Sequence, residues 1–154
     1  MDSLYIIGFP SLYGGAGAEL YHQIKVWRHM CVDIHLIPTQ KNVHRAELYP
    51  EMVGQGVTVH EGYDWSAIPE GAPVISFCNE EFLTALPEIR KRTRRTVFVN
   101  CMTWLFGSEK EAMKRGDISL FLYQNDRVRK NMMPRLRALN ADPSIRFMTF
   151  KPYF

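Results

Sequence analysis

The sequence predicts an α/β protein with a Rossmann-like, mostly parallel sheet of about six to seven strands and helices on both faces. Short apolar runs alternate with helix-like segments, which implies parallel strands joined by right-handed crossovers. Several runs are continuously apolar, as expected for strands covered on both faces. A glycine-rich segment between the first strand and the first helix completes the pattern.

The expected strands are short apolar runs bounded by glycine, proline or polar residues. They span residues 4–9, 33–38, 57–60, 73–78, 96–101, 118–123 and 145–150. The clearest are Val97-Phe98-Val99 and Leu120-Phe121-Leu122, which no polar residue interrupts.

The first helix is expected over residues 18–31. Its apolar residues recur at spacings of four, three and four, which places Leu20, Ile24, Trp27 and Cys31 on one stripe. Polar side chains occupy the other positions, so this helix is amphipathic and packs one face against the sheet.

Two later helices contain proline. We expect a helix over 80–86 that ends at Pro87, with one further turn over 88–92. A second helix is expected over 126–139, where Pro134 kinks it or breaks it in two.

Two shorter helices complete the expected elements. Ser108 is expected to cap a helix over 109–115, with Glu111 completing a capping box and Gly116 ending the helix. A short helix near 46–53 is expected within the least regular part of the chain.

The composition is that of an ordinary globular protein of one domain, with 154 residues and 46% hydrophobic residues. No apolar run is long enough to span a membrane, and the N-terminus lacks the features of a signal peptide. Cys31, Cys78 and Cys101 show no metal-ligand or disulfide spacing, so we expect reduced core thiols in a cytoplasmic protein. The five histidines are scattered, and no metal site is expected.

Positive charge is concentrated in two stretches. The run Arg90–Arg95 holds five cations in six residues, and a second basic stretch covers 127–137. Such runs are usually solvated faces. The alternative is a peripheral contact with an anionic membrane, at its inner face, or with a lipid-linked phosphate. Nucleic acid is not expected as a partner, because no aromatic residues are interleaved with the cations.

The glycine-rich segment predicts a ligand site. Gly14, Gly15, Ala16 and Gly17 lie between a strand and a helix, where bare N–H groups favour a phosphate. The alternative is a tight turn with no ligand. A dinucleotide is disfavoured, because Leu20 stands at the third glycine position and no acidic residue follows the second strand. The Walker pattern is also absent.

Polar residues follow the later strands, at the edge where open α/β sheets bind ligands. Asn79, Asn100, Trp104 and Asn125 are therefore candidate contacts for a polyhydroxylated acceptor. The alternative for such Asn residues, and for Asp126, is that they cap helices and turns.

Two adjacent carboxylates, Glu80 and Glu81, follow the fourth strand. Glu80 is a weak candidate for a catalytic base. The alternative is that both acids only favour the macrodipole of the first helical turn. The chain contains no Asp-x-Asp metal chelate and no recognisable nucleophile elbow.

Two stretches carry a family resemblance. Residues 13–22 read YGGAGAELYH, and residues 27–39 read WRHMCVDIHLIPT. Together they resemble the N-terminal, acceptor-side domain of GT-B glycosyltransferases, within the large retaining (GT4-like) group that includes sucrose-phosphate synthases and mannosyltransferases. That group shows a glycine pair, a helix and then G-H-E-V-H-V-x-T, so Cys31 stands where the family has glycine. The motif match covers about residues 4–39.

The resemblance implies that residues 1–154 form one Rossmann-like domain that binds the acceptor. The resemblance also implies that a nucleotide-sugar donor is the co-substrate and that a C-terminal domain, expected in cis or in trans, holds it, so the chain alone is expected to be inactive. Gly14, Gly15 and Gly17 would line the cleft between the two domains. Many family members carry a His near the end of the fifth strand, where this chain has Asn100 and Cys101.

Two rival functions stay open. One is a non-catalytic Rossmann-like module that binds a ligand or a partner. The other is a small complete enzyme such as a nicotinamide-dependent oxidoreductase, which the missing acidic residue after Thr39 disfavours.

Overall fold

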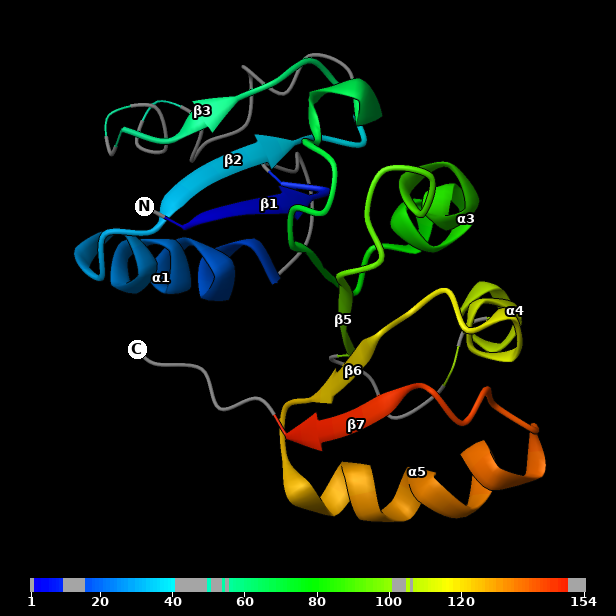
Figure 1. Ribbon diagram of the computed structural model, residues 1–154. Coiled ribbons are helices and arrows are strands. Elements are labelled where there is room, and N and C mark those ends of the chain that lie inside the picture. The colour runs from blue at the N-terminus through cyan, green and yellow to red at the C-terminus, as the bar shows by residue number, and fades with distance from the viewer. Residues whose placement is uncertain are drawn as a thin grey trace.

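The computed structural model describes residues 2–9, 16–40, 50, 54, 56–100, 105 and 107–149, with the backbone alone at 16–19 (Figure 1). Seven strands form one sheet in the order β3-β2-β1-β4-β5-β6-β7. Every neighbouring pair is parallel. The Rossmann-like α/β fold expected from the sequence is therefore confirmed.

Each expected apolar run coincides with a strand, although the bounds differ by one or two residues and β1 begins one residue before its expected run. The strands are β1 (Ser3–Ile7), β2 (Asp33–Ile37), β3 (Thr58–Val59), β4 (Val74–Phe77), β5 (Thr96–Asn100), β6 (Leu120–Tyr123) and β7 (Arg146–Thr149). All four residues of β4 are buried, which explains why its sequence shows no polar alternation.

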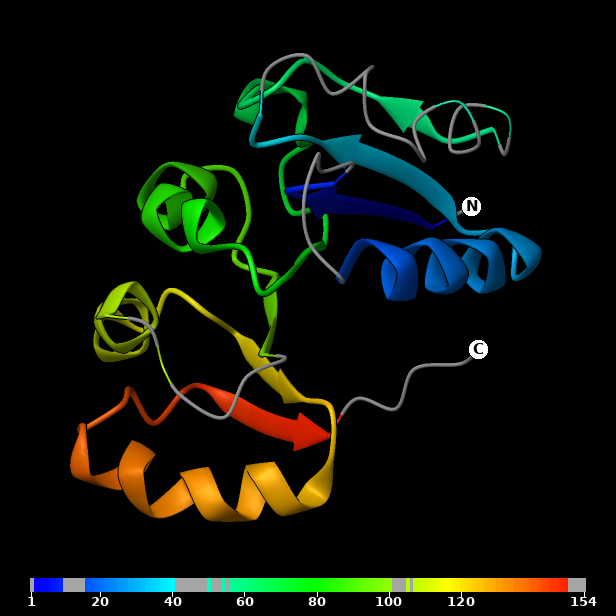
Figure 2. The same cartoon turned by 180° about the vertical axis from the view of Figure 1, so that it is seen from behind.

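Helices cover both faces of the sheet, as expected (Figures 1 and 2). On one face α1 (Ala16–His29) packs through Leu20 and Ile24 on β1 and β2. On the other face lie α3 (Glu80–Ile89), α4 (Gly107–Arg115) and α5 (Asp126–Ala138). Each face thus has its own apolar core, with alternate strand residues pointing into one core or the other.

The expected stripe of the first helix is correct at its start and wrong at its end. Leu20 and Ile24 are buried and Trp27 is partly buried, but Cys31 is exposed. Cys31 lies beyond the end of α1 and has a φ of 63°, in the left-handed region that favours glycine. Cys31 is therefore not a core thiol, and Cys78 is only half-buried.

Proline breaks neither helix, so the expected end of a helix at Pro87 and the expected break at Pro134 are wrong. α3 continues through Pro87 to Ile89, and α5 runs through Pro134 to Ala138. Each proline removes one helical hydrogen bond. In α3 the buried side chain of Ile89, beyond the proline, favours continuing the helix because it fills the core. Tertiary packing thus outweighs the local preference.

The expected cap of the fourth helix is also wrong. α4 begins at Gly107, so Ser108 lies inside the helix and donates its hydroxyl to Oε1 of Glu80, 3.3 Å away. The end of the helix at Gly116 is confirmed, since Gly116 follows Arg115 with a φ of 73°. The helix expected near 46–53 lies largely outside the described residues.

Candidate functional site

The strand order reverses between β1 and β4, which places the switch point of the sheet there. Gly8 follows β1 with a φ of 91°, and Asn79 follows β4. A Cβ atom on Gly8 would lie 2.3 Å from Nδ2 of Asn79, so only glycine fits this position. Sequence reasoning missed Gly8, although a glycine that ends an apolar strand is a signal of close approach.

Asn79 links the switch point to the end of β2. Its Oδ1 accepts a hydrogen bond from the backbone N–H of Phe82, which caps α3, while its Nδ2 donates to Oγ1 of Thr39 at 2.9 Å. Thr39 is buried. The alternative foreseen for Asn79, a helix cap, is thus realised, and the amide is held rigidly at the edge of the sheet.

A tyrosine closes the same corner. The Tyr63 hydroxyl lies 2.7 Å from Oε2 of Glu81 and also contacts the carbonyl oxygen of Thr39. The hydrogen bond to Glu81, followed by burial, raises the pKa of Tyr63. Tyr63 has a φ of 63°. The network therefore lies after β2, at the place where dinucleotide-binding domains carry the acidic residue that binds the ribose.

The predicted phosphate-binding segment is described only at its end. Gly14 and Gly15 lie outside the described residues, as does Trp104, while Ala16 and Gly17 form the first turn of α1. This helix, expected from Ala18, therefore begins two residues earlier.

Asn125 and Asn100 lie at the ends of neighbouring strands, but one is exposed and the other is buried. Asn125 is exposed and accepts from the N–H of Val128, which caps α5. Asn100 is buried, and its Nδ2 donates to Oε2 of Glu109 at 2.8 Å. Asn79 and Asn125 follow β4 and β6, and Asn100 is the last residue of β5, so all three lie at the same edge, on strands spaced about 4.8 Å apart.

Sequence reasoning missed a buried polar cluster beneath this edge. Glu109 is fully buried although its carboxyl group is ionisable, and it belongs to the first turn of α4. Tyr123, paired with Asn100 across β5 and β6, has a buried hydroxyl with no hydrogen-bond partner in the described part of the chain. Burial, and then the nearby charge of Glu109, raises the pKa of Tyr123. Strand register brings Asn100 and Tyr123 together, and the packing of α4 on the sheet adds Glu109.

Glu80, the candidate base, is exposed in the first turn of α3. Its contact with Ser108 ties the N-terminus of α3 to that of α4. Glu80 and Glu81 thus both occupy the first turn, where carboxylates favour the macrodipole, and Glu80 also stays open to a ligand.

The basic run Arg90–Arg95 connects α3 to β5, at the edge of the sheet opposite the switch point. Arg90 donates to the carbonyl oxygens of Arg94 and Gly116, and Arg92 donates to that of Ile68. Lys91 pairs with Glu88 at 3.1 Å. Three of the five cations therefore have partners within the protein, while Arg94 and Arg95 are exposed.

A second titratable cluster joins β1, β2 and β3. Oδ2 of Asp33 lies 2.8 Å from Nε2 of His35, whose Nδ1 lies 2.9 Å from Nε2 of His60. The Tyr5 ring stacks on His35 with centroids 4.5 Å apart. In the tautomer of His35 that donates from Nε2 to this carboxylate, Nδ1 accepts a hydrogen bond from Nε2 of His60. Burial lowers the pKa of His60, and the hydrogen bond from His35 lowers that of Asp33.

The described residues contain neither a membrane-spanning helix nor a group of metal ligands. No helix among them has the length and apolar character needed to cross a membrane. No three or more His, Cys, Asp or Glu side chains in this part of the chain are grouped as a metal site would require.

The fold and the site define a class: an α/β Rossmann-like domain with its candidate ligand site at the switch point of a parallel sheet. Comparisons with family models, with curated proteins and with solved structures give no significant match to this chain.

Proposed function

We propose that this chain binds a sugar or sugar phosphate at the switch point between β1 and β4, as the acceptor-side domain of a GT-B-like glycosyltransferase. The observation that carries the proposal is the close packing of Asn79 on Gly8, which holds a side-chain amide in a fixed place at the switch point. Ligands of open α/β sheets bind at such a point.

The polar groups at this edge suit a polyhydroxylated ligand. Asn79 and Asn125 offer amide groups held by helix caps, and Glu80 offers an exposed carboxylate. Amides both donate and accept hydrogen bonds, so they match sugar hydroxyls. The glycine segment that leads into α1 would contact a phosphate through its N–H groups.

Two further observations favour this function over a dinucleotide enzyme. The Thr39–Asn79–Tyr63 network occupies the corner where a ribose would bind. Cys31 adopts a left-handed conformation at the position where the resembling family has glycine.

In the proposed reaction, a nucleotide sugar held by a second domain, in cis or in trans, donates its glycosyl group to a hydroxyl of a sugar or lipid-linked acceptor on this domain. Glu80 is the candidate that orients this hydroxyl. Backbone N–H groups and cations would stabilise the departing phosphate without a metal. We place the activity in the cytoplasm, where cysteines stay reduced.

A second candidate is a non-catalytic binding module. The observation in its favour is that Asn79, Asn125 and Glu81 already serve as helix caps or as a tyrosine partner. Groups that are already hydrogen-bonded within the protein are better suited to holding a ligand than to transferring protons.

Calorimetric titration with glucose 6-phosphate, fructose 6-phosphate and NAD tests the proposal. We expect a sugar phosphate to bind and Gly15→Val to weaken it about tenfold or more, because side chains block close approach to backbone N–H groups. Gly54→Ala is the matched control, since a Cβ there meets nothing within 4 Å. Tighter binding of NAD, or turnover of UDP-glucose by the chain alone, would overturn the proposal.

A further inference from the structure

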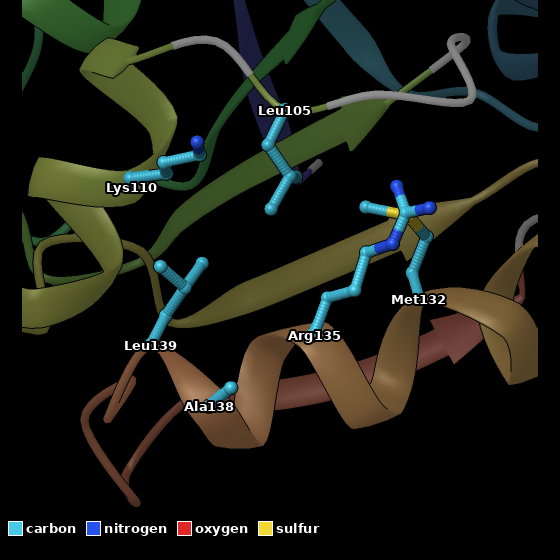
Figure 3. A pocket seen from close by; sticks show the side chains of 6 residues that line it. All are labelled: Leu105, Lys110, Met132, Arg135, Ala138 and Leu139. Atoms are coloured by element: carbon cyan, nitrogen blue, oxygen red, sulfur yellow. The ribbon is translucent and has the colours of Figure 1, made fainter.

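A groove runs between α4 and α5, on the outer side of the helical layer. α3 and α4 pack directly on each other, but between α4 and α5 the surface is hollowed by a cavity of about 310 Å³. Its described lining consists of Leu105, Lys110, Met132, Arg135, Ala138 and Leu139 (Figure 3). This volume lies at the lower end of the range found for small-molecule sites.

The floor of the groove is apolar. Met132 is buried and belongs to the core beneath the helices, and Leu105 packs partly buried against the same core. Leu139 stands at the far end of the groove, near the end of α5 (Figure 3). A hydrocarbon chain laid on this floor would therefore remove apolar surface of both partners from water.

Two cations flank this floor. Figure 3 shows Lys110 on α4 and Arg135 on α5, on opposite sides of the groove. Neither side chain forms a hydrogen bond or an ion pair within the described residues, although other cations of the same helices do, such as Lys114 with Glu111 and Arg129 with Asp126. The two charges at the groove are thus left for another partner.

No acid offsets these charges at the groove. The described lining contains no Asp or Glu, and neither do residues 101–104 and 106, which flank Leu105 in the sequence. Of the two acids that adjoin Lys110 along α4, Glu109 points inward to Asn100 and Glu111 pairs with Lys114. A neighbouring cavity shares Met132 and Arg135 and continues the groove along α5.

We propose that this groove binds a monomeric anionic amphiphile, with its alkyl chain on Met132 and Leu139 and its carboxylate or phosphate between Lys110 and Arg135. The apolar floor accounts for the alkyl chain, and two cations without a partner among the described residues account for the anionic head. The site is separate from the switch point and does not depend on the proposed transferase function.

Calorimetric titration with octyl phosphate and with octanoate, below their micelle concentrations, tests this site. We expect saturable binding of both, and binding of octanol weaker by about tenfold or more because it lacks the charge. Lys110→Gln combined with Arg135→Gln should weaken octyl phosphate binding by a similar factor. Lys130→Gln, which removes a single charge from an exposed residue of α5 outside the groove, should leave it unchanged.

A second variant tests whether binding requires the open groove as well as the two cations. Ala138 is exposed, so Ala138→Trp should fill the groove without disturbing the core and abolish binding while retaining both cations. Three results would overturn the proposal: no saturable binding, equal binding of octanol, or an equal loss in Lys130→Gln. Binding only to anionic phospholipid vesicles, and not to octyl phosphate, would also overturn it and indicate a membrane surface instead.

Discussion

A Cβ atom on Gly8 would lie 2.3 Å from Nδ2 of Asn79, so the strands on either side of the switch point are joined by a contact that only glycine permits. The Asn79 side chain cannot move away freely, because it caps α3 and bonds to Thr39. The geometry of the candidate site therefore depends on a residue without a side chain.

Gly8→Ala should lower the free energy of unfolding by about 2–3 kcal/mol, from left-handed strain plus the clash. Gly71→Ala is the matched control: Gly71 has a φ of 77°, but a Cβ there meets nothing within 4 Å. We expect Gly71→Ala to cost about 1 kcal/mol. Urea denaturation measures both values, and equal losses would contradict the role of the Asn79 contact.

Cys31→Gly should raise the stability of the protein. Cys31 is exposed and holds a φ of 63°, so glycine relieves left-handed strain without removing core packing. We expect a gain of about 0.5–1 kcal/mol after the entropy cost of glycine in the unfolded chain. Cys31→Ala removes the thiol but keeps the strain, so its melting temperature should not rise. A similar gain in both variants would show that the thiol itself is responsible.

Tyr123→Phe should leave stability unchanged or raise it by up to about 1 kcal/mol, because it removes a buried hydroxyl without a partner in the described structure. Tyr63→Phe is the contrasting variant, since its hydroxyl lies 2.7 Å from Glu81. It should cost about 0.5–1 kcal/mol. Thermal unfolding of both variants measures the difference, and a large loss in Tyr123→Phe would reveal a partner for that hydroxyl.

The paired histidines predict a stability that falls in mild acid. The folded-state pKa of His60 is lowered from its usual 6.5, so the unfolded chain takes up a proton first as the pH falls. The contribution of His60 is thus complete above pH 6.5 and is lost as the pH drops through the lower folded value. The lowered pKa of Asp33 acts in the same direction below its usual 3.8.

His60→Gln keeps an N–H donor for His35 but cannot take up this proton. We expect its unfolding free energy to depend less on pH between 6.5 and 5, by at most about 1.4 kcal/mol per pH unit. His22→Gln, at an exposed position, is the control and should keep the wild-type dependence. Urea unfolding at several pH values measures this dependence. An unchanged slope of unfolding free energy against pH in His60→Gln would contradict a role for His60 in the loss of stability.

The sequence predicts the strands and the parallel sheet well, because buried β-strands leave continuous apolar runs that local reading detects. It fails at Pro87, where packing of distant residues decides the local conformation. It also misses the Asn100–Glu109–Tyr123 cluster, because their proximity follows from strand register and from the packing of α4. The place of Asn79 at the edge of the sheet is predicted, because it follows a strand. The close approach of Gly8 to Asn79 becomes visible only when β1 and β4 are paired.

Amide chemical-shift mapping with a sugar phosphate is the sharpest test of a ligand site at the switch point, because it locates the ligand as well as detecting it. The account predicts that fructose 6-phosphate or glucose 6-phosphate shifts the N–H signals of Gly8, Asn79 and the first turn of α1, while signals of Arg94 and Arg95 at the opposite edge stay unchanged. Shifts confined to the opposite edge, or no saturable shift with either sugar phosphate, would contradict a ligand site at the switch point.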